Sequence, residues 1–187
     1  MPRVRATQFT VPADATFGSV EAALGWASHP GDTRAPTDLR IWSWAPGGSS
    51  LNPVLRMIAD GNGRLRSEIA GWWFEPSDAV GLTRPDHRRC VDVPGLRRIC
   101  VAGPVPVEDG RSRALLSQLA AAATCGRADA DAVAVVTDSE DLVVDVRASQ
   151  TVKGFRCNAP DARRDAGSRE ALAILAAIRA LATQGLK

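Results

Sequence analysis

The sequence predicts an α+β fold, an antiparallel sheet of β-hairpins with two main helices packed on one face. Two segments, 53–74 and 90–100, place strand-like runs on either side of a glycine-containing turn. Two others, 111–125 and 168–183, repeat apolar residues at helical spacing. The chain has 187 residues and is 45% hydrophobic, which suits a single domain with one core.

The hairpin in segment 53–74 has a register that follows from its turn. If Gly61-Asn62-Gly63 forms the loop, Asp60 lies opposite Arg64, and one face of the hairpin becomes charged while the other becomes mostly apolar. A slip by one residue would mix the two faces, so this register is favoured. The resulting pairs are Arg56–Glu68, Ile58–Arg66, Leu55–Ile69, Ala59–Leu65 and Met57–Ser67.

Further strands and turns follow from local composition. Pro104 and Pro106 are expected to break the chain, and a short helix is expected from Ser19 to His29, ended by Pro30 and Gly31. The remaining predicted strands are 5–11, 39–44 and a three-stranded meander at 131–137, 142–147 and 152–157.

The two main helices each carry an apolar stripe that should face the core. Ser168 is the expected N-cap of the second helix. The predicted core stripes are Leu115, Leu116, Leu119 and Ala123 in the first helix, and Ala171, Leu172, Ile174, Leu175, Ile178 and Leu181 in the second.

The four cysteines are compatible with two disulfides. With Pro94-Gly95 at the centre of a hairpin, Cys90 lies directly opposite Cys100, at a separation that a bridge can span. Cys125 and Cys157 would then form the second pair. Free buried thiols, and a zinc site that includes His87, are the two competing interpretations. The cysteine spacing lacks paired C-x-x-C knuckles, which disfavours zinc.

The order of these features resembles a group of uncharacterised bacterial secreted or periplasmic proteins. The resemblance is carried by segment 39–44, the hairpin ending in Gly71-Trp72-Trp73, the two-cysteine hairpin, and the run 142–160 before an Ala/Leu/Ile helix. Members of this group often place tyrosines in the penultimate strand, whereas this chain has no tyrosine. The resemblance implies an extracytoplasmic location, with a signal peptide absent from the sequence given, and it implies no activity.

Composition argues against several partner classes. The net charge is only +2, from 23 basic and 21 acidic residues, so a nucleic-acid partner is not expected. The sequence has no run of 18 apolar residues that would indicate a transmembrane segment. The oligomeric state does not follow from composition.

No catalytic signature is evident, and no cofactor is expected. The chain lacks a G-x-S-x-G elbow, a Walker A motif and a G-x-G-x-x-G run. It has two histidines, His29 and His87, neither in a recognisable constellation. An acidic hairpin could bind a hard cation but is more simply a polar turn, so no metal is expected. Its acidic residues are Asp138, Glu140, Asp141 and Asp145.

Two groups of residues are candidates for contacting a partner. Basic side chains concentrate around the cysteine hairpin and could hold an anion or a carboxylate, although a solvated hairpin surface is the simpler explanation. Arg40 shares a strand face with Trp42 and Trp44, a composition found in interface hot spots and also in a small second core under the terminal helices. The basic group comprises Arg84, His87, Arg88, Arg89, Arg97 and Arg98.

The sequence therefore favours a non-enzymatic extracytoplasmic domain that binds a protein or an anionic surface ligand. The alternative is a hydrolase of unrecognised type that uses His87 or the acidic hairpin.

Overall fold

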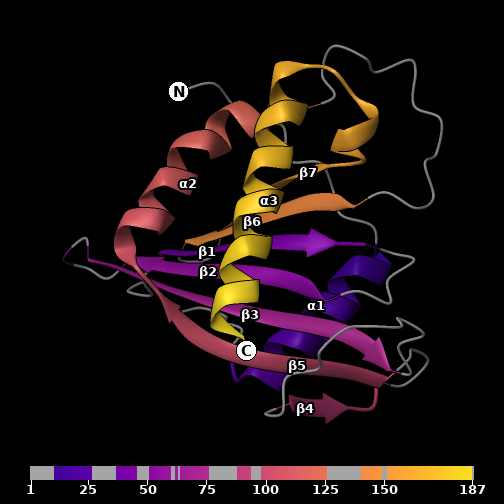
Figure 1. Ribbon diagram of the computed structural model, residues 1–187. Coiled ribbons are helices and arrows are strands. Elements are labelled where there is room, and N and C mark those ends of the chain that lie inside the picture. The colour runs from indigo at the N-terminus through magenta and orange to yellow at the C-terminus, as the bar shows by residue number, and fades with distance from the viewer. Residues whose placement is uncertain are drawn as a thin grey trace.

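The fold is known from a computed structural model, in which the described residues form one antiparallel sheet and three α-helices (Figure 1). The structure describes residues 11–26, 37–45, 51–59, 62, 64–75, 88–93, 98–125, 140–148 and 151–186. The α+β class predicted from the sequence is confirmed. No helix among these residues is long and apolar enough to cross a membrane.

Seven strands form the sheet, in the order β4-β5-β3-β2-β1-β6-β7, and all neighbours are antiparallel. Strands from both ends of the chain therefore share one sheet, because β6 pairs with β1. The strands are β1 (Thr37–Trp44), β2 (Asn52–Ala59), β3 (Leu65–Glu75), β4 (Arg88–Val91), β5 (Arg98–Val107), β6 (Asp141–Ala148) and β7 (Thr151–Cys157).

The predicted hairpin registers are confirmed. Arg56 lies opposite Glu68 and Leu55 opposite Ile69 between β2 and β3. Cys90 lies opposite Cys100 between β4 and β5. Strands β6 and β7 form a hairpin as expected, whereas the predicted strand at 131–137 lies outside the described residues.

The expected chain break at the prolines is wrong, because β5 runs through Pro104 and Pro106 to Val107. The strand accommodates them with a local irregularity. Gly103 adopts a φ of 87°, a conformation open mainly to glycine, and the pairing with β3 shifts register between Ile69 and Gly71. The ladder then resumes, so the sheet continues up to the start of the next helix.

The helices are α1 (Val11–Leu24), α2 (Asp109–Ala122) and α3 (Ala166–Gly185), with a short 3₁₀ turn, η1 (Pro160–Ala162), before α3. Figure 1 shows α2 and α3 in front of the sheet and α1 behind it. Residues of α2 and α3 share one buried apolar cluster with the strands, and residues of α1 share a second cluster. The sheet is therefore covered on both faces.

The N-terminal helix differs from the prediction. Helix α1 covers Val11–Leu24 rather than Ser19–His29, and Val11 is its first residue instead of the end of a strand. Pro12 suits a first helical turn, and Gly25, with a φ of 72°, ends the helix. The rest of the predicted strand, and the segment containing His29, lie outside the described residues.

The start of α3 also differs in one detail. The N-cap is Asp165, whose carboxylate accepts a hydrogen bond from the Ser168 backbone N–H at 2.9 Å. Ser168 instead lies within the first turn, where its hydroxyl donates to Asp165 at 2.6 Å. An aspartate cap also complements the positive end of the helix dipole.

Candidate protein-interaction surface

Helices α2 and α3 lie antiparallel and are fastened at both ends. At one end, Arg111 Nη1 donates to Gln184 Oε1 at 2.7 Å. At the other end, the Cys125 sulfur lies 3.3 Å from the Ser168 hydroxyl, and Gly167 lies against the backbone of residues 124–125. The absence of a side chain at Gly167 permits this close approach. The two helices therefore form a fixed layer over the sheet.

A disulfide ties this layer to the sheet. Cys125, just beyond α2, is bridged to Cys157 at the end of β7, with the two Cα atoms 5.6 Å apart. The second disulfide joins Cys90 and Cys100 across β4 and β5. Both predicted pairings are therefore present, and the free-thiol interpretation is wrong. Each bridge limits the freedom of the unfolded chain and so stabilises the fold.

Each of the two helices exposes one leucine that the sequence predicted to be core. Leu116 of α2 and Leu172 of α3 are each 37% exposed, and they are the exposed large hydrophobic residues among those described. Their neighbours Leu115 and Leu175 are buried, as predicted. Each predicted core stripe therefore included one leucine too many, Leu116 in α2 and Leu172 in α3, and both lie on the surface.

A shallow groove of about 340 Å³ lies between the two helices on this face. Its lining is dominated by alanines, with Leu115 and Leu181 beneath and Arg111 and Gln184 at one end. Small side chains keep the groove open to an approaching chain. The lining alanines are Ala114, Ala173, Ala177 and Ala180.

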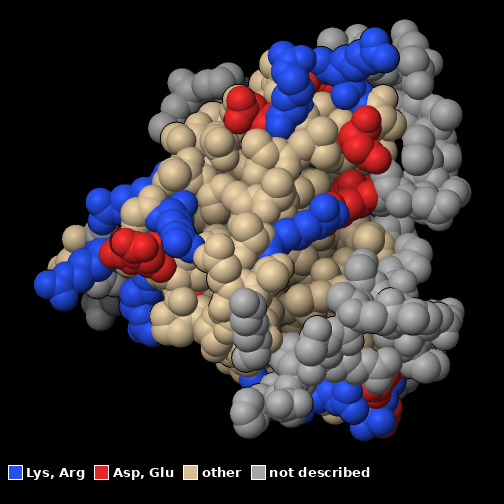
Figure 2. Space-filling view, in the orientation of Figure 1, with Lys and Arg blue, Asp and Glu red and all other residues tan. Residues whose placement is uncertain are grey.

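The middle of the same face carries few charged residues, although Arg111 lines one end of the groove and Arg113 is exposed on α2. Residues 114–124 contain no charged residue, and Arg179 is the sole charged residue in 171–185. Arg179 itself forms an ion pair with Glu140, which also accepts a hydrogen bond from the Ser43 hydroxyl. Figure 2 shows a largely uncharged area over α2 and α3, crossed by one basic side chain that meets an acidic one, with further charged side chains at its edges. We call this area, with its groove, the α2–α3 face.

Exposed helix faces in monomeric proteins normally carry charged residues, whereas depletion of charge marks the centre of an interface. The α2–α3 face combines the absence of charge from residues 114–124 with a groove lined by alanines and by Leu115 and Leu181. It therefore has the properties of a surface that contacts another protein.

The predicted basic group is only partly described, and its charges are offset. Arg88 and Arg98 lie 3.7 and 3.8 Å from the two carboxylate oxygens of Glu75, and Arg98 is also 3.5 Å from Asp92. Arg89 is exposed on the edge strand β4. The other three members, Arg84, His87 and Arg97, lie outside the described residues. Anion binding by this group stays a prediction.

Arg40 and Trp42 are not on the surface, because α1 covers the strand face that carries them. Both are fully buried, and Trp44 is half-buried beside them. The ring of Phe17 from α1 stacks on Trp42 with centroids 4.4 Å apart. The aromatic residues thus form a second core, as one interpretation allowed, but α1 covers this core instead of the terminal helices.

Arg40 lies in a buried ionic network that links α1 to the sheet. Its guanidinium forms an ion pair with Glu21 of α1 and donates to Asp38 at 2.8 Å. Arg56, on the neighbouring strand, donates to the same Asp38 carboxylate at 2.9 Å and to Glu68 at 3.2 Å. The Trp26 ring covers both guanidinium groups, with centroid distances of 5.6 and 5.2 Å.

The network holds its members in the charged state. Burial alone would raise the pKa of Asp38, but hydrogen bonds from Arg40 and Arg56 outweigh burial and place that pKa below its usual value. Burial would likewise lower the pKa of Arg40, but Asp38 and Glu21 raise it. Paired charges buried in this way fix the position of α1, and α1 excludes external ligands from them.

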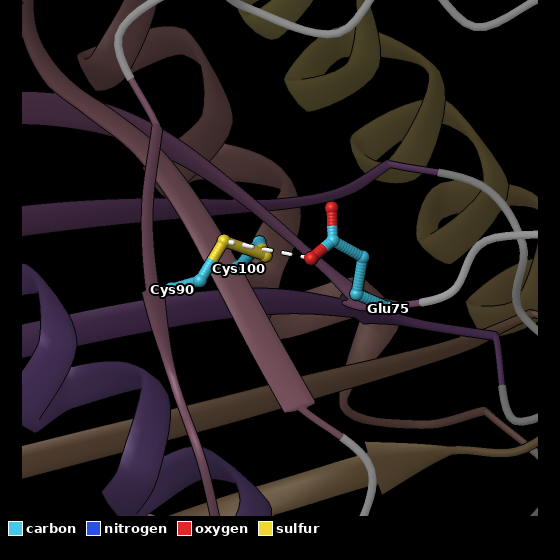
Figure 3. A group of neighbouring side chains, drawn as sticks. All are labelled: Glu75, Cys90 and Cys100. Atoms are coloured by element: carbon cyan, nitrogen blue, oxygen red, sulfur yellow. Dashed lines mark hydrogen bonds between the residues drawn. A yellow bond between two sulfur atoms is a disulfide. The ribbon is translucent and has the colours of Figure 1, made fainter.

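The metal interpretations find no support in the described residues. Glu75, Cys90 and Cys100 lie close together in Figure 3, but the two sulfurs are joined to each other and cannot act as thiolate ligands in this state. The acidic hairpin does not form a joint site either. Asp141 pairs with Arg156, and Asp145 accepts from the Trp42 indole at 3.2 Å, while Asp138 lies outside the described residues.

Comparisons with known proteins add no assignment. No protein-family model, curated protein or solved structure matches this chain.

Proposed function

We propose that this chain is an extracytoplasmic interaction domain that binds another protein through its α2–α3 face. The observation that carries the proposal is the groove between two helices joined at both ends, which is lined mainly by small and apolar side chains and has no charged residue along 114–124. In this proposal the role of the chain is to bind a protein partner, and the sheet and disulfides hold the α2–α3 face in position for that contact.

The two disulfides support a location outside the cytoplasm. Such bonds persist in oxidising compartments and are rare in reducing ones. One of them joins the end of α2 to β7 and so helps to hold the proposed surface in place. The described residues also include no helix able to cross a membrane, so we propose that the folded domain acts outside the lipid bilayer.

Apolar and uncharged side chains on the α2–α3 face support the choice of a protein partner. An anionic ligand would be expected to bind where guanidinium groups converge, yet Arg179 at this face is already paired with Glu140. Alanine and leucine side chains contribute to affinity mainly by leaving water. A complementary protein surface supplies the extended apolar contact that they require.

A matched pair of substitutions tests the proposal. Ala173 lines the groove on α3, whereas Ala22 is exposed on α1, on the opposite side of the sheet. Ala173→Glu places a charge on the α2–α3 face, and Ala22→Glu makes the same chemical change elsewhere. Each tagged variant would be exported by its native route, extracted without denaturation and sized by gel filtration.

The unmodified chain is expected to elute in an assembly larger than its 19.8 kDa monomer. Ala173→Glu should shift it to the monomer position, and Ala22→Glu should not. Elution of the unmodified chain as a monomer, or equal behaviour of the two variants, would contradict the proposal. Circular dichroism of both purified variants would verify that they fold.

A further inference from the structure

We infer that the Cys90–Cys100 disulfide is a thiol–disulfide exchange site that reacts with small anionic thiols, whereas the Cys125–Cys157 disulfide is purely structural. This inference goes beyond the proposed binding function and does not depend on the α2–α3 face. It rests on where the bridge lies in the sheet, on which of its sulfurs solvent can reach, and on the charges around it.

The Cys90–Cys100 bridge joins an edge strand to its neighbour. Strand β4 stands first in the strand order and, within the described sheet, pairs only with β5, over the four residues Arg88–Val91. The two cysteines lie opposite each other in this ladder and are 10 positions apart in the sequence. Local opening of one short element costs much less than global unfolding. The bridge can therefore open while the other six strands stay paired.

The Cys125–Cys157 bridge holds a more demanding position. It joins the chain just beyond α2 to the end of β7, across 32 positions of sequence. The Cys125 sulfur also lies 3.3 Å from the hydroxyl of Ser168, in the first turn of α3. Opening this bridge would loosen the helices from the sheet, and a bridge that closes a longer loop contributes more to stability. The fold therefore depends on this bridge more than on the other.

The two sulfurs of the exchange site differ in access. Cys100 is fully buried in β5, whereas Cys90 is half-buried on the edge strand. An incoming thiolate would attack Cys90 Sγ and form a mixed disulfide, while the bond to Cys100 Sγ breaks and leaves its electron pair there. The Cys100 thiolate then takes up a proton from water. A second small thiolate attacks the small-molecule sulfur of the mixed disulfide, which releases Cys90 as a thiolate and the small molecule as its own disulfide.

The charges around the site favour an anionic thiol. A carboxylate oxygen of Glu75 lies 4.0 Å from the attacked sulfur, and Figure 3 shows this carboxylate directed towards the bridge. Arg88 and Arg98 lie 3.7 and 3.8 Å from the same carboxylate, and their side chains are 40% and 52% exposed, so both guanidinium groups reach solvent. Arg89 is exposed on the same strand, and Asp92 contacts Arg98 at 3.5 Å. Among the described residues, three arginines thus oppose two carboxylates, and this positive excess attracts anions and stabilises thiolates.

Reduction by glutathione, a small anionic thiol, tests the inference on the native, oxidised chain at neutral pH. Samples taken over time would be quenched with acid, alkylated and digested, so that mass spectrometry reports the state of each cysteine. The Cys90–Cys100 bridge should open at least about tenfold faster than the Cys125–Cys157 bridge. A glutathione adduct should appear on Cys90, and the circular dichroism spectrum should not change while this bridge opens.

Arginine substitutions test the role of charge. Arg88→Gln combined with Arg98→Gln should slow opening by glutathione about threefold at low ionic strength, and the difference should vanish at high ionic strength. Arg113→Gln makes the same change at an exposed position on α2 and should have no effect. Cysteamine, whose thiolate carries a compensating ammonium group, should open the bridge equally fast in all variants. A general structural effect of the substitutions would slow both thiols.

Equal opening rates for the two bridges, or unfolding in step with the opening of the Cys90–Cys100 bridge, would overturn the inference. An adduct on Cys100 instead of Cys90, or equal slowing of glutathione and cysteamine by the arginine substitutions, would also overturn it. None of these outcomes involves the α2–α3 face. The gel-filtration assay with Ala173→Glu therefore tests the proposed function separately.

Discussion

Replacing Asp38 by asparagine should remove much of the free energy of unfolding that the buried ionic network contributes. The Asp38 carboxylate accepts hydrogen bonds from both Arg40 and Arg56, at 2.8 and 2.9 Å. The asparagine has the same shape but no charge, so two buried guanidinium groups lose their shared counter-ion. Removing one partner from a buried ion pair typically costs about 3–5 kcal/mol, a large share of the roughly 5–15 kcal/mol that stabilises a domain.

Urea denaturation at pH 7 would measure this loss as a lower unfolding midpoint at unchanged slope. The control is Asp92→Asn, because Asp92 is almost fully exposed and its 3.5 Å contact with Arg98 should contribute no more than about 1 kcal/mol. A loss below about 1 kcal/mol for Asp38→Asn would refute the argument that the network holds α1 on the sheet.

The pH dependence gives an independent check on the same residue. The pKa of Asp38 is lower in the folded protein than its usual value, so the folded state binds this proton less readily than the unfolded state. Its contribution is therefore fully present above the unfolded pKa of about 3.9 and is lost as the pH falls through the folded pKa. The difference in stability between the wild type and Asp38→Asn should shrink below about pH 4. A difference that is constant from pH 7 to pH 3 would contradict this assignment.

Three further measurements test the fold. Replacing both cysteines of the Cys125–Cys157 bridge by serine should lower the free energy of unfolding, measured in urea, by about 3.7 kcal/mol. The same change at the Cys90–Cys100 bridge should lower it by about 2.8 kcal/mol, because that bridge closes the shorter loop. The reverse order would contradict this reasoning. Gly167→Ala should lower stability by about 1–3 kcal/mol, since a Cβ there would lie 2.7 Å from the Thr124 carbonyl carbon, whereas Gly18→Ala in open space on α1 should raise it by about 0.5–1 kcal/mol. Thermal unfolding that moves in the same direction for both glycine variants would refute this packing. A thiol assay on denatured, unreduced protein should find no free thiol, and four thiols would remove the argument for an oxidising compartment.

Hairpin geometry was predictable because a strand has a side-chain period of two. Once the turn was placed, pairs such as Arg56–Glu68 and Cys90–Cys100 followed, and the structure contains both. The predicted anion patch includes Arg84 and His87, which lie outside the described residues, so anion binding there stays a prediction.

Burial was less predictable, because it depends on which elements cover a given face. Strand alternation correctly placed Arg40 and Trp42 on one face, but their burial follows from α1, whose bounds were predicted wrongly. A helical stripe likewise shows which face of a helix is apolar, but it does not show how much of that face the neighbouring elements cover. Leu116 and Leu172 were assigned to the core for that reason. The absence of charge from residues 114–124 was the available sequence signal for an exposed, uncharged face.

Site-specific photo-crosslinking in cells that export the protein tests the central claim most directly. A photoreactive amino acid at position 173 lies on the α2–α3 face, and the same amino acid at position 22 lies on α1 behind the sheet. We predict a discrete crosslinked protein species from position 173 and none from position 22. A crosslink from position 22 alone, or none from position 173 at natural expression levels, would contradict the assignment of the α2–α3 face as the interaction surface.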